Sequence, residues 1–122
     1  MNRQIDEILN KLSKSTFRSS FHLRNYMISY IDEKGMDVVR SHATDFVNQK
    51  LGVYDPKKDG KQTPMKNHPV FIAMHACAFC CRGCLEKWYQ IPKERDLTEE
   101  EKKFIVKLLM TWIEREYTTR KK

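Results

Sequence analysis

The four cysteines of the chain lie within eight positions, and their spacing marks them as the residues best placed to do chemistry. They are Cys77, Cys80, Cys81 and Cys84. A disulfide framework spreads its cysteines so that the bridges close long loops, whereas every possible loop here is short. In a reducing compartment, clustered thiols indicate metal binding or thiol chemistry rather than cross-linking. We therefore looked for donors that could share one ion with them.

The C-x2-C pair of Cys81 and Cys84, with Gly83 between them, is the tightest part of this cluster. The spacing places Cys84 in the first turn of an expected helix, where backbone N–H groups and the helix dipole stabilise a thiolate. We therefore expect the pKa of Cys84 to be lowered. A thiolate in that position suits either Zn²⁺ or nucleophilic chemistry.

A zinc site needs four nitrogen or sulfur donors, or three donors and an open position. Cys81 and Cys84 supply two, and His75 or Cys80 is the expected third. The fourth is Cys80 or His42, because on a straight helix His68 would stand ~10 Å from His75. Two interpretations without a metal stay open. In one, the thiols pack as small apolar groups; in the other, His42 is a residue of the core.

Iron–sulfur chemistry is the less favoured interpretation of the same cysteines. Cys77, Cys81 and Cys84 have the C-x3-C-x2-C spacing of enzymes that bind a cluster with S-adenosylmethionine. Those enzymes need a barrel much larger than this chain of 122 residues. Two adjacent cysteines also make such spacings easy to obtain by chance.

The elements that must position these residues are all helical. Apolar residues recur at helical spacing in several segments, and no segment alternates like a strand. We expect a small all-α domain of five to six helices over residues 1–122, with a basic tail at 118–122. The expected helices cover about 3–13, 23–33, 37–51, 69–79, 82–89 and 98–117. Pro69 and the Thr98/Glu101 capping box mark two starts, and Gly35 and Gly52 mark two ends.

A long loop is expected at about 52–68, between two of these helices. It is rich in Gly, Pro, Asp and Lys, and loops of this length in small domains are often functional. Lys61, Gln62, Thr63 and His68 are the residues in it that we expect to contact a substrate or partner. The chain has 23 basic and 16 acidic residues, a net charge of +7. That balance permits a nucleic acid or another anionic partner, although a solvated surface is the simpler reading.

No apolar signal segment opens the sequence, and no apolar stretch is long enough to cross a bilayer. We therefore expect a cytoplasmic protein with no membrane partner.

Several runs of residues together resemble a bacterial family known only as the domain of unknown function 4186 family. They are KLSKSTFRSSFHL, RSHATDF, DGKQTPMKNHPVFIAMHA, CCRGCLEKW and LTEEE, in this order. The resemblance spans about residues 11–115 and implies a small bacterial protein, but no activity. It also implies that the family pattern includes His42, His68, His75, Cys80, Cys81, Cys84 and Trp88. Cys77 departs from that pattern, which further weakens the iron–sulfur spacing.

Two functions follow from these residues. The leading hypothesis is a metal-binding domain that holds one ion, zinc above others, through His75, Cys81 and Cys84 with Cys80 or His42. The alternative is an enzyme that uses a reactive cysteine thiolate or an open metal position, with Glu86 or His68 as acid or base.

Overall fold

The computed structural model describes residues 2–53 and 68–121, and helices joined by short connections make up these segments. Its elements are α1 (Asn2–Ser13), α2 (Thr16–Ser19), α3 (Asn25–Lys34), α4 (Met36–Lys50), α5 (Pro69–Ala76), α6 (Arg82–Tyr89) and α7 (Glu99–Lys121). No strand occurs in the described segments, which confirms the all-α fold. None of the described helices is long and apolar enough to cross a membrane.

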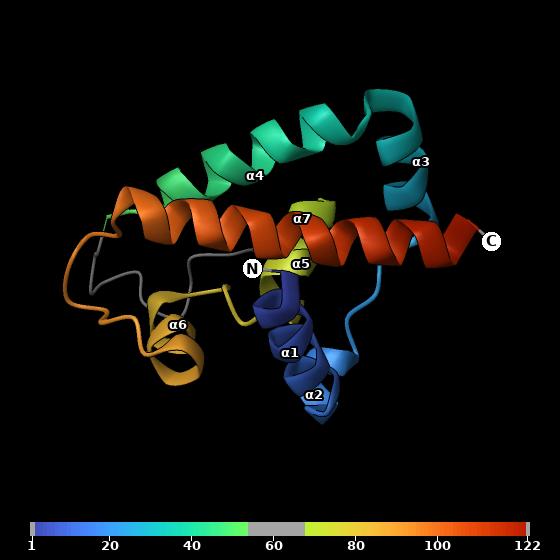
Figure 1. Ribbon diagram of the computed structural model, residues 1–122. Coiled ribbons are helices and arrows are strands. Elements are labelled where there is room, and N and C mark those ends of the chain that lie inside the picture. The colour runs from blue at the N-terminus through green and yellow to red at the C-terminus, as the bar shows by residue number, and fades with distance from the viewer. Residues whose placement is uncertain (1, 54–67, 122) are drawn as a thin grey trace.

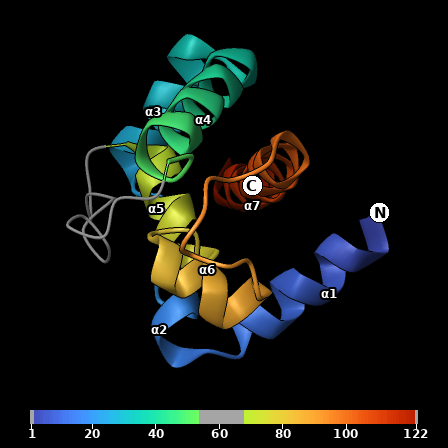
Figure 2. The same ribbon diagram turned by 90° about the vertical axis from the view of Figure 1, so that its left-hand side faces the viewer.

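Helix α5 is the centre of the packing. It contacts α4, α7 and α2, and Figure 2 shows it between α3 and α4 on one side and α2 and α6 on the other. Apolar residues surround it, as expected of a helix that is buried on every side. Figure 1 shows α7 running the length of the molecule with α4 beside it. The core side chains of these helices include Val39, Val47, Val70, Met74, Ile105, Leu108 and Ile113.

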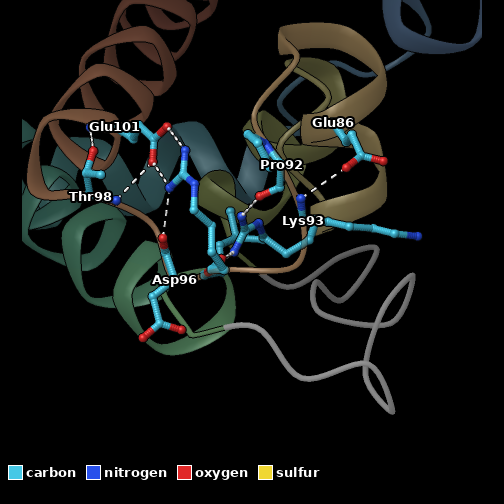
Figure 3. Close-up of polar contacts among 9 residues, drawn as sticks. Glu86, Pro92, Lys93, Asp96, Thr98 and Glu101 are labelled. Carbon is cyan, nitrogen blue, oxygen red and sulfur yellow. Dashed lines mark hydrogen bonds and ion pairs between the residues drawn. The ribbon is translucent and has the colours of Figure 1, made fainter.

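Helix starts follow the signals in the sequence. Pro69 is in the first turn of α5. At the start of α7 the Thr98 hydroxyl accepts from the Glu101 N–H at 3.1 Å, and the Glu101 carboxylate accepts from the Thr98 N–H at 2.9 Å. Figure 3 shows these two residues facing each other. Gly35, with φ +89°, links α3 to α4. The structure thus confirms the Thr98/Glu101 capping box and the helix end at Gly35.

Three predicted segments differ from the structure. No helix was expected between the helices at about 3–13 and 23–33, but this stretch contains α2, whose first turn is capped by the Ser15 hydroxyl. Helix α5 ends at Ala76 rather than 79, because a reversal follows it in which the Phe79 N–H donates to the Met74 carbonyl at 2.7 Å. Ala78 takes the left-handed conformation there, at φ +61°, a place usually held by glycine.

The expected C-terminal tail is also helical as far as Lys121. Contacts with α3 hold it: Tyr117 donates to the Asp32 carboxylate, and Arg120 donates to the Asn25 side chain at 3.2 Å. These long-range contacts outweigh the weak helix preference of the two threonines that follow Tyr117.

Candidate metal centre

Three thiols converge where α6 begins. The Sγ atoms of Cys80 and Cys84 are 3.4 Å apart, as are those of Cys81 and Cys84. All three sulfurs lie within 4.8 Å of one another, which is close enough to share one ion. Cys80 and Cys84 are partly exposed, and Cys81 is buried. The structure therefore confirms a Cys80/Cys81/Cys84 group that could hold a metal.

Local backbone geometry produces this convergence. The reversal after α5 brings the chain back, and Cys81 then serves as the N-cap of α6 in an extended conformation. Its sulfur accepts from the Cys84 N–H at 3.4 Å. Because a cap residue and the third residue of the first turn lie on the same side of a helix start, their side chains meet. Cys80 precedes the cap and approaches Cys84 from the other side.

Arg18 of α2 is a functional residue that sequence reasoning missed. Its guanidinium donates to Cys80 Sγ at 3.5 Å, to Cys84 Sγ at 3.3 Å and to the His75 carbonyl at 2.7 Å. The side chain is only 8% exposed. It comes from a segment more than 55 residues away in sequence, so no local spacing signals it. Its charge favours thiolates at the two sulfurs it touches.

The thiols of this group differ in acidity. The hydrogen bond with Cys84 and the nearby Arg18 guanidinium outweigh burial and lower the pKa of Cys80 to about 7. The pKa of Cys84 is raised, because Cys84 shares a hydrogen bond with Cys80, is partly buried and faces the Cys80 charge. The expected lowering at Cys84 is therefore wrong: once Cys80 ionises, its neighbour keeps its proton. Burial also raises the pKa of Cys77, which lies outside the group.

The predicted histidine ligands are placed elsewhere. His75 is buried, and its ring stacks on Phe21 with centroids 5.4 Å apart. It is not part of the group formed by the three thiols, and neither is His42. The His42 Nδ1 atom lies 3.0 Å from His68 Nε2 and 3.1 Å from the Tyr30 hydroxyl. Of the predicted ligands, the structure thus brings together the three cysteines alone.

His68 acts as the N-cap of α5. Its Nδ1 accepts from the Val70 N–H at 3.0 Å, so the proton of the neutral ring is on Nε2 and is donated to His42 Nδ1. Burial and the neighbouring His42 lower the pKa of His68 to about 4, which keeps the ring neutral near pH 7. Lys61, Gln62 and Thr63, predicted to contact a partner beside it, lie outside the described residues.

The buried Arg82, between Cys81 and Gly83, fixes the start of α6 to its surroundings. Its side chain is fully buried and donates to the carbonyls of Leu51 at 3.1 Å, Pro92 at 2.6 Å and Arg95 at 2.9 Å. Figure 3 shows Pro92 on this connection, near the contact between the Lys93 N–H and the Glu86 carboxylate. The end of α4 and the α6–α7 connection therefore hold the helix that carries two of the three thiols.

One known protein family matches the chain that carries this thiol group. The model of the family described as Domain of unknown function (DUF4186) matches residues 6–114, which is most of the chain and contains every residue of the thiol group. The chain belongs to this family. The resemblance seen in the sequence runs is thereby confirmed. No solved structure matches the DUF4186 chain.

Proposed function

We propose that this DUF4186 protein binds one zinc ion through the thiolates of Cys80, Cys81 and Cys84. The observation that carries the proposal is the approach of the three sulfur atoms to within 4.8 Å of one another. With Zn–S bonds of about 2.3 Å in a tetrahedral arrangement, two bound sulfurs stand ~3.8 Å apart. The observed separations of 3.4 Å need only a small adjustment to reach that geometry.

The donor set favours a single soft ion. Thiolates bind Zn²⁺, Cu⁺ and iron–sulfur clusters in preference to Mg²⁺ or Ca²⁺. An iron–sulfur cluster distributes its cysteines over two or more irons, so the three sulfurs would not all lie on one metal ion. The close approach of these three sulfurs instead suits ligands of one ion. Three protein donors leave a fourth position for water or another small ligand.

Arg18 supports a metal at this place. A divalent ion with three thiolates carries a formal charge of −1, which is costly to bury without a partner. The guanidinium already lies against two of the three sulfurs and supplies the compensating charge. Binding of the ion would join α6 to the segment that carries α2.

Metal analysis of purified protein tests this proposal. We expect about one equivalent of zinc per chain after expression without added metal, and its loss in Cys84→Ser. Cys77→Ala is the matched control, because Cys77 is a fully buried cysteine outside the group. It should retain the ion, with circular dichroism checking that both variants remain helical. Wild-type protein without stoichiometric metal that also fails to bind added Zn²⁺ would contradict the proposal.

A further inference from the structure

Two of the clustered sulfurs are arranged for a reaction with each other. Cys80 Sγ lies 3.4 Å from Cys84 Sγ, and the Arg18 guanidinium donates to both. We propose that hydroperoxides oxidise this pair of thiols to a Cys80–Cys84 disulfide. The disulfide depends only on this geometry. Its consequence, release of the bound ion, rests on the proposed function.

Accessibility selects Cys80 and Cys84 as the sulfurs that a hydroperoxide can reach. Both are partly exposed and both have Arg18 as a cationic neighbour, the surroundings typical of reactive cysteines. Cys81 is 8% exposed, and its sulfur accepts the Cys84 N–H as the cap of α6. Cys77 is fully buried and lies outside the group. Oxidation should therefore start at one thiol of the Cys80/Cys84 pair, and the other thiol resolves it.

The chemistry balances in two steps. In the first, the thiolate of one cysteine of the pair attacks one oxygen of the peroxide, so that an S–O bond forms, the O–O bond breaks and hydroxide leaves. In the second, the sulfur of the other cysteine attacks the oxidised sulfur, the S–S bond forms and the S–O bond breaks with loss of water. Two thiols and one hydrogen peroxide thus give one disulfide and two waters. Arg18 touches both reacting sulfurs and stabilises the anionic one.

Loss of the ion follows from the number of ligands. The disulfide takes two of the three sulfurs, and Cys81 alone would remain as a thiol ligand. A zinc site with one remaining protein ligand does not hold the ion. Reduction of the disulfide would restore the site. The group would then couple metal occupancy to the supply of hydroperoxide.

Oxidation of the metal-free, reduced protein with one equivalent of hydrogen peroxide tests the inference. We expect the intact mass to fall by two hydrogens. Trypsin cuts after Arg82 and separates the Cys84 peptide from the one that carries Cys80 and Cys81, so a cross-linked pair reports the bond. Cys81→Ser should still form it, whereas Cys80→Ser and Cys84→Ser should not. In at least one of these two variants dimedone should trap a sulfenic acid on the remaining cysteine of the pair.

Arg18→Gln should slow the reaction by about tenfold, because it removes the cation at the reacting sulfurs. Arg24→Gln, at an exposed arginine nearby, is the matched control and should react like the wild type. Arg18→Lys retains the charge and covers the case in which the glutamine variant does not fold. A Cys81–Cys84 disulfide, or dimedone on Cys81 or Cys77, would overturn the inference. If the disulfide forms in protein that binds no zinc, the proposed function fails and this inference stands.

Discussion

At the scale of single residues, Arg82 is the side chain whose loss should cost most. It is fully buried and donates to three backbone carbonyls from two separate stretches of chain. A planar guanidinium reaches several acceptors at fixed angles, whereas an ammonium on a flexible stem does not. Its hydrogen bonds join the start of α6 to the end of α4 and to the α6–α7 connection, so Arg82 supports the thiol group without touching an ion.

Arg82→Lys should lower the free energy of unfolding by about 2 kcal/mol or more, because buried carbonyls would lose charged donors. Urea unfolding followed by circular dichroism measures the change. The control is Arg40→Lys, since Arg40 is exposed and pairs with Glu114 at 3.6 Å on the surface. That substitution should change the free energy by less than about 0.5 kcal/mol. Equal midpoints for the two variants would refute the role given to Arg82.

The acidity of the thiols shows what residue types alone do not reveal. The sequence correctly pointed to Cys80, Cys81 and Cys84 because their spacing is unusual. It did not reveal Arg18, because that contact spans more than 55 residues. The helix-start argument assigned the lowered pKa to Cys84, and the structure gives it to Cys80. The missing information was the hydrogen bond between the two thiols, which lowers the pKa of Cys80 and raises that of Cys84.

At the scale of elements, the start of α7 carries the clearest pH dependence. Arg95 donates to both oxygens of the Glu101 carboxylate, at 2.9 and 2.8 Å, and Glu101 also completes the capping box. These contacts lower the pKa of Glu101 to about 2, with the Arg95 hydrogen bond as the largest cause. The folded state therefore binds this proton less readily than the unfolded state does.

Glu101→Gln should destabilise the protein near pH 7, and the deficit should shrink as the pH falls. The stabilising contribution of Glu101 is present in full above its ordinary pKa of 4.5 and is lost toward about pH 2, where the folded carboxylate is protonated. The measurement is the difference in urea midpoint between wild type and variant at pH 7, 4 and 3. Glu100→Gln, at the neighbouring exposed acid, is the control. A difference that does not change with pH would contradict the assignment.

Element boundaries were predictable where a chemical signal marks them. Thr98 with Glu101, Pro69 and Gly35 each have a residue type that the local backbone requires, and the structure places a helix end at each. The end of α5 was missed because Ala78, not glycine, takes the left-handed position. Helix α2 was missed because its four residues lie in a Ser- and Thr-rich run typical of a loop.

At the scale of the whole molecule, α5 organises two polar groups at its opposite ends. His68 begins the helix and contacts His42 of α4, while the turn that follows Ala76 leads to the three thiols. The sequence analysis named all these residues as candidate ligands or contacts. It could not assign them to two separate groups, because the length of α5 and the direction of the chain after it decide which side chains meet.

The net charge of +7 is a property of the whole molecule and permits an anionic partner. Binding of nucleic acid, the contacts predicted for Lys61, Gln62 and Thr63, the cytoplasmic location and the enzymatic alternative all stay predictions. The proposed site at the thiol group, in contrast, makes a specific prediction: one zinc ion with three cysteine ligands.

X-ray absorption at the zinc edge of the reduced, zinc-loaded protein tests that claim most directly. The account predicts three sulfur scatterers at about 2.3 Å with one lighter atom completing the shell. A shell of two sulfurs with two imidazole nitrogens at about 2.0 Å would contradict it, because histidine would then take the place of one of the three cysteines.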